Sequence, residues 1–247
     1  MRLAILCLTV WAAQASAQQF EVASIKTVNT DSSSSGIRTG HGRLDASNVT
    51  LQRCIIGAWG VGPSQVVGGP AWLTTDRFDI SAKAAEPTND DAVLNLMLRR
   101  LLADRFQLAL HTETRTMQAY ILEVAKGGPN PVNLKKTAAP TPVGASTTTN
   151  GTNTQTSIEA RQTSMDLFAK VLARELRLPV VDRTGLAGDF DFTLSWTPDR
   201  IRATAPADSD LPTIFTAVQD QLGLHLRAEK TPIEVLVIDR AEKPSGN

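Results

Sequence analysis

The chain has 247 residues, and its 25 lysines and arginines balance 25 aspartates and glutamates, which gives a formal net charge of zero at neutral pH. This balance removes the electrostatic argument for binding nucleic acid or an anionic membrane surface. We therefore expect no nucleic-acid partner.

The first residues have the pattern of a secretory signal. Arg2 supplies a positive charge, residues 3–13 are largely apolar, and the small residues at 15–17 suit a signal peptidase. The apolar run is too short for a stable membrane span. We expect residues 1–17 to be a signal peptide and Gln18 to begin an exported mature chain, either periplasmic or extracellular, with no membrane insertion after cleavage.

Cleavage would leave Cys54 as the sole cysteine, so an internal disulfide is not expected. Ile55 and Ile56 follow it directly, a setting typical of a small core residue. A nucleophilic role is the alternative, but no histidine or asparagine lies near Cys54 in sequence to activate it.

Similar features recur in segments 48–126 and 163–240, at an offset between 112 and 116 residues. Each segment begins with a hydroxyl residue suited to a helix N-cap, Thr50 or Ser164, followed by a short apolar helix. This pattern predicts an internal repeat.

Further matched elements follow in each segment. The alternating stretches 76–81 and 188–193 predict strands with one face on a core. Apolar stripes predict one helix that starts at Asp90 and another that starts at Asp210 with Pro212 in its first turn.

A β-hairpin is expected after each of these later helices. Its second strand would be Met117–Val124 in the first segment and Ile233–Ile238 in the second, each following a polar stretch. The predicted fold class is therefore α+β, with two repeated helix-plus-antiparallel-hairpin units and helices on one face of each small sheet.

The expected organisation is a first α+β repeat over residues 18–126, a flexible linker over 127–155 and a second repeat over 156–247. The linker is rich in proline, threonine, glycine and asparagine and has few residues to bury. Whether the repeats form one body or two stays open.

The sequence contains no recognisable catalytic motif. His41, His111 and His225 lack the spacing of metal ligands, and nucleotide-binding glycine patterns are absent, so we expect neither a metal nor a cofactor. Asp79 and Asp191 sit on the predicted strands, where alternation favours solvent-facing charges. The alternative is an acid pair of a hydrolase.

Four aromatic residues are candidates for an interaction surface, although burial in the core is the expected role of each tryptophan. Strand edges such as Met117–Val124 offer a second way to bind a partner, by accepting an added strand. The four aromatic candidates are Trp59, Trp72, Trp196 and Tyr120.

Six ordered motifs resemble the soil-associated family of exported proteins, a domain of unknown function expanded in the Acidobacteria. The resemblance covers essentially the whole mature chain and assigns no catalytic residue. Similar domains are attached to membrane metallopeptidases of the β-lactam-sensor type, which implies an extracytoplasmic sensing or binding role. The motifs are Phe20-Glu-Val-Ala-Ser-Ile-Lys, Gly68-Gly-Pro-Ala-Trp-Leu with Asp76-Arg-Phe-Asp-Ile, Leu101-Leu-Ala-Asp-Arg-Phe-Gln-Leu, Val124-Ala-Lys-Gly-Gly-Pro, Val181-Asp-Arg-Thr-Gly-Leu-Ala-Gly-Asp-Phe-Asp-Phe-Thr-Leu and Val235-Leu-Val-Ile-Asp.

The leading functional hypothesis is a non-enzymatic envelope or secreted module that binds a protein, peptide or glycan. Two alternatives stay open. One is an extracytoplasmic hydrolase whose site is assembled from aspartates and histidines, and the other is a structural component of the envelope.

Overall fold

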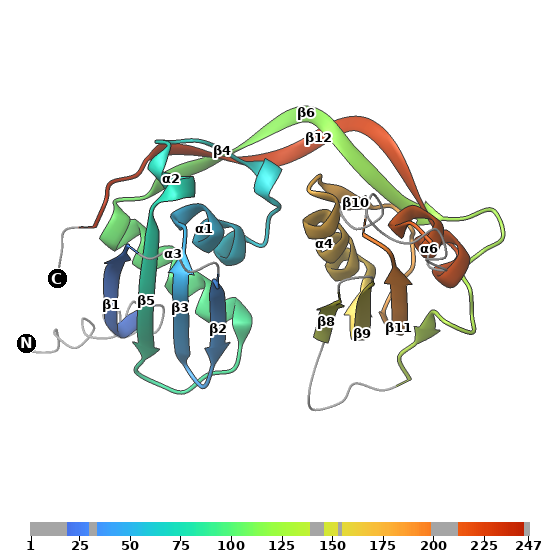
Figure 1. Ribbon diagram of the computed structural model, residues 1–247, viewed down its shortest axis with the longest axis horizontal. Helices are drawn as coiled ribbons and strands as arrows, with labels where there is room; N and C mark the ends of the chain where they lie inside the picture. The colour runs from blue at the N-terminus through green and yellow to red at the C-terminus, as the bar shows by residue number, and fades with distance from the viewer. Residues whose placement is uncertain (1–18, 30–33, 139–145, 153–154, 199–211, 245–247) are drawn as a thin grey trace, which may run out of the picture. The chain divides into compact units, whose positions relative to one another are not determined.

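The computed structural model of the protein describes residues 19–29, 34–138, 146–152, 155–198 and 212–244 (Figure 1). It confirms the α+β class, because helices combine with three small four-stranded sheets. The described chain divides into two compact units. The first holds residues up to 114 and from 234 onward, and the second holds residues 115–233. Within the described ranges, no helix is long and apolar enough to cross a membrane.

Most elements belong to one unit. In the first unit these are β1 (Phe20–Val28), β2 (Gly36–Gly40), β3 (Arg43–Val49), α1 (Leu51–Trp59), the short 3-10 helix η2 (Pro63–Gln65), β4 (Val66–Gly68), α2 (Trp72–Thr75), β5 (Arg77–Ala84) and α3 (Asp91–Phe106). In the second they are β7 (Lys135–Lys136), β8 (Ser146–Gly151), β9 (Thr156–Ser164), α4 (Met165–Leu176), β10 (Val180–Asp182), β11 (Asp189–Trp196) and α6 (Ile214–Leu222). Two long strands, β6 (Ala109–Val124) and β12 (Leu224–Arg240), contribute residues to both units.

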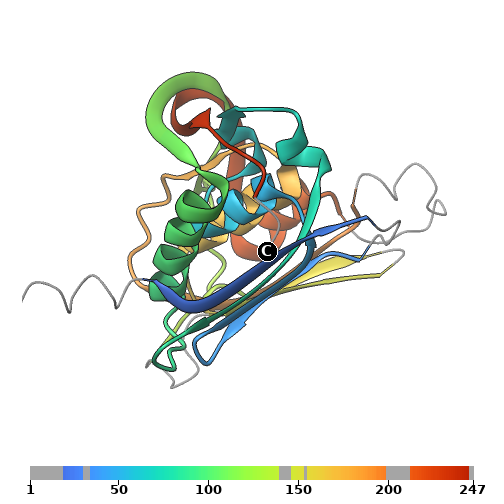
Figure 2. The same ribbon diagram turned by 90° about the vertical axis from the view of Figure 1, so that its left-hand side faces the viewer.

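The first unit is built on the antiparallel sheet β1-β5-β3-β2. Alternation along β5 turns Phe78 and Ile80 inward while Ser81 stays exposed. Helices α1 and α3 cover the apolar face and contribute Ile55 and Leu102 to one core with these residues (Figure 2). The opposite face remains polar.

The second unit has the antiparallel sheet β7-β11-β9-β8. Phe168 of α4 meets Phe192 of β11 edge to face at 4.7 Å between ring centroids, and Val218 of α6 is buried in the same core. The outer face of this sheet carries Glu159, Arg161 and other polar side chains.

The third sheet has the strand order β10-β6-β12-β4. In the second unit β10 runs parallel to β6, with Val180 opposite Tyr120, and in the first unit β4 runs parallel to β12, with Val66 opposite Leu236. Gly69, directly after β4, allows a close approach, because a Cβ there would overlap Leu73 and lie 3.0 Å from Ile238. Close packing against Leu73 and Ile238 therefore explains why glycine occupies position 69 of the Gly-Gly-Pro stretch.

The predicted helix starts are confirmed in three cases. Thr50 accepts the N–H of Arg53, Ser164 accepts that of Leu167, and Asp90 accepts those of Ala92 and Val93. Each side chain satisfies a backbone donor that lacks a partner inside its helix. The fourth start is wrong, because α6 begins at Ile214 behind the N-cap Thr213. Asp210 lies outside the described residues.

The predicted hairpins are also wrong. Residues 109–124 form one continuous strand, and so do residues 224–240. The polar stretch 112–116 contains three threonines and no glycine, proline or asparagine, so it favours an extended chain over a turn. The second polar stretch includes Pro232, which the strand accommodates at an exposed position.

The compact units differ from the ranges expected from the sequence. The chain passes between them at 114/115 and 233/234, so the C-terminal residues belong with the first unit. The expected linker 127–155 contains β7, β8 and the buried Leu134, and both strands belong to the second sheet. Strand pairing orders these polar residues even though few of them reach the core.

An ion-pair cluster in the second unit connects β6 and β12 with Arg183, the residue that follows β10. Glu229 Oε2 lies 2.5 Å from Arg227 Nη1, and Glu229 Oε1 lies 3.3 Å from Arg183 Nη1. Arg227 Nε also lies 3.3 Å from Glu123 Oε1. The hydrogen bond from Arg227 is the main reason that the pKa of Glu229 is lowered, and the positive charges of both arginines add to it.

A first prediction concerns Gly223, the C-cap of α6, whose φ is +68°. A Cβ there would overlap the carbonyl oxygen of Gly128 and lie 2.6 Å from the nitrogen of Asn130. Gly223→Ala is therefore expected to lower the free energy of unfolding by roughly 3 kcal/mol, the sum of a left-handed backbone and overpacking. Urea denaturation of the variant and the wild type measures this loss of stability.

The matched control is Gly185, which lies in the same unit with the same φ of +68°, but where an added Cβ would meet no neighbouring atom within 4 Å. Gly185→Ala should cost only the backbone contribution, about 1 kcal/mol. Equal losses in the two variants would contradict the role assigned to the contact with Gly128.

A second prediction concerns pH. Because the pKa of Glu229 is lower in the folded chain than its ordinary value of 4.5, its stabilising contribution is complete above pH of about 5 and is lost as the pH falls through the lowered pKa. The urea midpoints of the wild type and Glu229→Gln should differ most near pH 6, and the difference should shrink steadily as the pH falls below 4.5.

Salt provides an internal check on this result. The side chains of Arg227 and Glu229 are 45% and 29% exposed, so 1 M NaCl should also reduce the difference near pH 6. A difference that is independent of both pH and salt would show that the ion pairs do not cause it.

Candidate functional site

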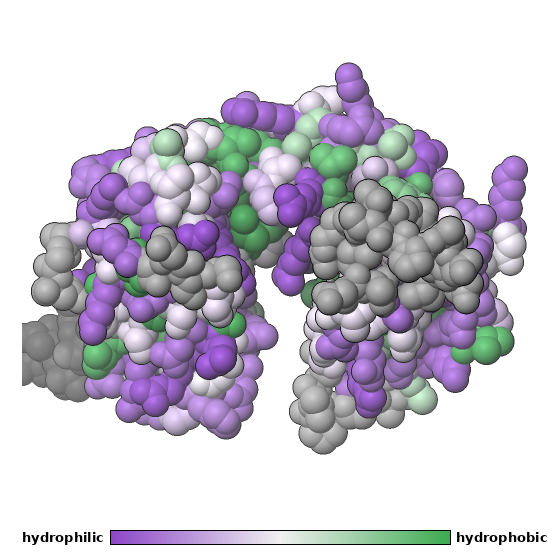
Figure 3. Space-filling view, in the orientation of Figure 1, coloured by the Kyte–Doolittle hydropathy of each residue, from purple (hydrophilic) through white to green (hydrophobic). Residues whose placement is uncertain are grey.

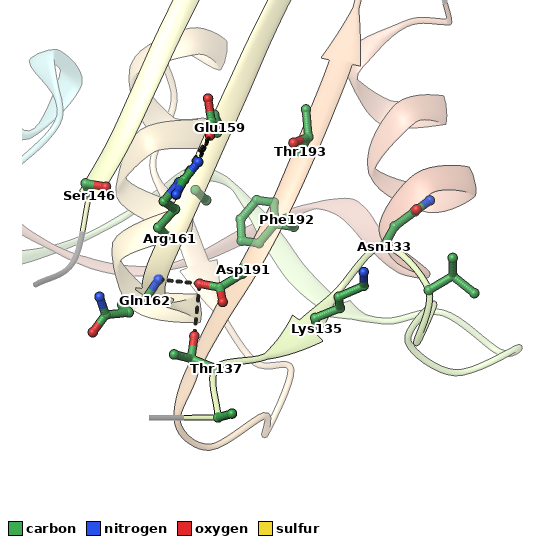
Figure 4. Close-up of a pocket in the computed structure, with 13 residues that line it drawn as sticks. Asn133, Lys135, Thr137, Ser146, Glu159, Arg161, Gln162, Asp191, Phe192 and Thr193 are labelled. Carbon is green, nitrogen blue, oxygen red and sulfur yellow. Dashed lines mark hydrogen bonds and ion pairs between the residues drawn. The ribbon is translucent and has the colours of Figure 1, made fainter. Parts of the chain in front are cut away.

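A groove of about 780 Å³ lies on the outer face of the second-unit sheet (Figure 4). Its lining comes from Ser146 on β8, residues 159–162 on β9, residues 191–193 on β11, and Val132, Asn133, Lys135, Thr137 and Ala138 in and around β7. Ala160 and Phe192 direct their side chains into the core and contribute mainly backbone, so the exposed lining is polar apart from the side chains of Val132, which is 70% exposed, and Ala138. The groove thus offers hydrogen-bonding and charged groups to a ligand.

Asp191 occupies a central place in this groove. Its Oδ1 accepts the backbone N–H of Gln162 at 2.7 Å and the hydroxyl of Thr137 at 3.0 Å. Gln162 has φ of +48° and lies where the register of β9 and β11 shifts. The carboxylate therefore supports a left-handed residue in a β-bulge, which otherwise strains the backbone.

An equivalent arrangement occurs in the first unit. Asp79 Oδ1 accepts the backbone N–H of Asn48 at 2.8 Å, and Asn48 has φ of +53° at the register shift between β3 and β5. Arg77 Nη1 donates to the carbonyl oxygen of Asn48 at 3.1 Å. Both aspartates of the acid-pair hypothesis thus anchor a bulge, each in its own unit.

The remaining charged groups of the groove are two cations and one further carboxylate. Arg161 Nε and Nη2 lie 3.1 and 2.7 Å from Glu159 Oε1, and this hydrogen bonding raises the pKa of Arg161. Lys135 stands opposite Asp191 in the β7–β11 pairing. Figure 4 shows Asp191 between Gln162 and Thr137 and Arg161 directed toward Glu159. The two negative charges, on Asp191 and Glu159, therefore balance the two positive charges, on Lys135 and Arg161.

The aromatic candidates lie outside the groove. Trp59 is half-buried under the guanidinium of Arg99 at 5.0 Å, and Trp72 packs against Phe78 and Phe106. Trp196 is 3% exposed in the second core, and half-buried Tyr120 packs against Phe215 at 5.2 Å between ring centroids. All four side chains therefore contribute to packing.

The expected open edge at Met117–Val124 is occupied in part. Residues 120–122 pair with β10, and the N–H of Tyr120 donates to the carbonyl oxygen of Pro179 at 2.8 Å. The sequence did not reveal this partner, because a three-residue strand has no periodicity to detect.

The histidines and the cysteine do not assemble a reactive cluster with the groove. His111 Nδ1 lies 2.9 Å from both carboxylate oxygens of Asp239 on exposed strands, and His225 is exposed on β12. Burial raises the pKa of Cys54 to about 12, which keeps the thiol protonated. His41 donates its backbone N–H to Asn89.

Within the described residues, no three histidine, cysteine, aspartate or glutamate side chains are placed to hold a metal ion. Large exposed hydrophobic side chains in the same part of the chain are Val22, Leu96 and Val132. Among the described residues visible in Figure 3, hydrophilic residues predominate. Polar contacts therefore dominate what these surfaces offer to a ligand.

A third prediction follows from the bulge in β9. Asp191→Ala should lower the free energy of unfolding by roughly 1–3 kcal/mol, because the N–H of Gln162 loses its acceptor. Asp191→Asn retains an acceptor oxygen and should lose clearly less. Urea denaturation of both variants tests this, and equal stability of Asp191→Ala and the wild type would contradict the anchoring role.

Comparison with known proteins identifies the family and no closer relative. A search among curated proteins found no match, and a search among solved structures found none either. A family model described as "Protein of unknown function (DUF3738)" matches residues 52–241, which span both compact units and the whole groove. The chain therefore belongs to the DUF3738 family of proteins of unknown function.

Proposed function

We propose that this protein is an exported, non-enzymatic binding module whose ligand occupies the groove on the outer face of β7-β11-β9-β8. The observation that carries the proposal is the makeup of that groove. Hydroxyl, amide and charged side chains form most of its lining, with Val132 and Ala138 as apolar additions. Its two carboxylates already have partners within the protein, because Asp191 accepts hydrogen bonds from Gln162 and Thr137 and Glu159 pairs with Arg161. A ligand that makes many polar contacts suits such a surface.

The hydrolase alternative is weaker for a specific reason. General acid–base catalysis needs a group free to exchange a proton with a bound substrate. Asp191 Oδ1 instead accepts two hydrogen bonds, and Asp79 accepts a backbone N–H in the other unit. Neither carboxylate lies in hydrogen-bonding contact with a histidine among the described contacts.

Export rests on the signal-peptide pattern of residues 1–17, which are outside the described residues. The resemblance to exported proteins that also occur attached to β-lactam-sensor-type metallopeptidases, together with their taxonomic range, supports an extracytoplasmic sensing or binding role. On this proposal the module acts in the periplasm or outside the cell and captures a protein, peptide or glycan. A structural envelope role is the remaining alternative.

A fourth prediction tests the groove. The mature protein, residues 18–247, is immobilised and exposed to envelope and culture-fluid fractions of the native host, and retained material is quantified by mass spectrometry. The double variant Lys135→Ala with Arg161→Ala should retain at least about fivefold less of the specific ligand, as expected for removal of a central contact.

The matched control carries Arg43→Ala and Lys83→Ala, which remove two positive charges from paired, exposed positions on the outer face of the first-unit sheet. This control should bind like the wild type. Equal retention by all three proteins would place binding elsewhere. Turnover of a substrate without a specific bound partner would reject the binding proposal.

A further inference from the structure

We propose that the ligand is an extended polypeptide segment that adds a strand to the edge of β8 and directs alternate side chains over the groove. This inference rests on the proposed function and names the class of its ligand. It depends on three properties of β8, namely its position in the sheet, its composition and its continuity with the groove lining.

β8 is the last strand in the order β7-β11-β9-β8. Residues 146–151 pair with residues 161–156 of β9 without a register shift. Because backbone groups in a strand point alternately to its two sides, half of those in β8 point away from β9. Within the part of the chain that the structure describes, no strand pairs with that side.

The composition of β8 leaves this edge unprotected. Proteins usually protect edge strands with charges, prolines, bulges or short length. β7 consists of two lysines, β1 has a register shift after Phe20 and an exposed Lys26, and β2 carries Arg38 between terminal glycines. β8 reads Ser-Thr-Thr-Thr-Asn-Gly, six regular residues with neither charge nor proline. Its threonines favour an extended chain.

The edge of β8 continues directly into the groove. Ser146 lines the groove opposite Arg161, and Thr148 stands opposite Glu159. Since directly opposed residues share a face of the sheet, a strand added beside β8 places alternate side chains in these same rows. A long side chain in the row of Ser146 would reach toward Arg161, and one in the row of Thr148 toward Glu159.

Charge complementarity then specifies the ligand. The added segment should carry an acidic residue in the row of Arg161 and a basic residue two positions away in the row of Glu159. Arg161 and Glu159 are 70% and 50% exposed, so both side chains are available to a partner while they contact each other. The recognised pattern is an acid and a base separated by one residue in an extended chain.

A second copy of this chain is the less favourable occupant. An edge of six residues is about 20 Å long and about 10 Å thick. That contact is far smaller than the roughly 1,200 Å² that stable interfaces between folded proteins bury. A flexible peptide has no rigid body to accommodate, so it can pair with β8 and also lay its side chains over the groove.

The experiment uses a phage-displayed library of random dodecapeptides, selected on the immobilised mature protein. Selected peptides are synthesised with a fluorescent label, and their dissociation constants are measured by fluorescence anisotropy. We expect enrichment of the acid-x-base pattern in uncharged, β-prone surroundings. Hydrogen exchange of residues 146–151 should slow when such a peptide is bound.

Backbone N-methylation tests strand addition directly, because it removes one N–H at a time. Methylation of every second peptide amide, those facing β8, should weaken binding at least tenfold. Methylation of the intervening amides, which face solvent, should have little effect. If the loss of binding does not alternate between successive peptide amides, strand addition is overturned.

The double variant Glu159→Arg with Arg161→Glu tests the charge rule while preserving the ion pair. It should exchange the preferred order of acid and base in the selected peptides. The matched control exchanges Arg43 and Asp45, which are exposed and two residues apart on β3 of the other sheet. This control should leave the preference unchanged.

Three outcomes would overturn the inference. They are selection of no peptide, binding unaffected by the charge exchange, and self-association through β8 that competes with every selected peptide. The proposed function is tested separately, by the retention experiment. If envelope material is retained by the wild type and lost in the Lys135→Ala/Arg161→Ala variant while no peptide is selected, the groove binds a ligand of another class.

Discussion

In both compact units, a carboxylate from the neighbouring strand accepts the N–H of a left-handed residue at the end of a strand. Asp79 performs this role for Asn48, and Asp191 for Gln162. The left-handed residue shifts the pairing register two positions before a helix N-cap. The following helix then folds back over the apolar face of its sheet, so both cores depend on a satisfied backbone donor at this bend.

The long strands β6 and β12 set the organisation of the units. Each contributes residues to both, and β12 returns the end of the chain to the first unit, where it pairs with β4. The first unit therefore includes residues far apart in sequence, such as Val66 and Leu236. Truncation before β12 would remove a strand from the third sheet and buried residues from both cores.

The same bonding that supports the fold restricts the chemistry of the groove. Asp191 is held by a backbone N–H and a hydroxyl, and Glu159 is held by a guanidinium. Such acids present fixed charge and hydrogen-bonding capacity, which serves recognition. The uncharged edge of β8 lies beside them, so one surface combines side-chain recognition with backbone pairing groups.

The sequence by itself determined the α+β class, the strands around Phe78 and Phe192 and three helix starts, because hydrophobic periodicity and capping depend on neighbours within a few residues. Only the tertiary structure decided that residues 109–124 and 224–240 are single strands, that β8 belongs to a sheet, and that the strand aspartates anchor bulges. These features depend on partners distant in the chain. Threonine favours an extended chain in these segments, but local sequence does not identify the distant strand with which such a segment pairs.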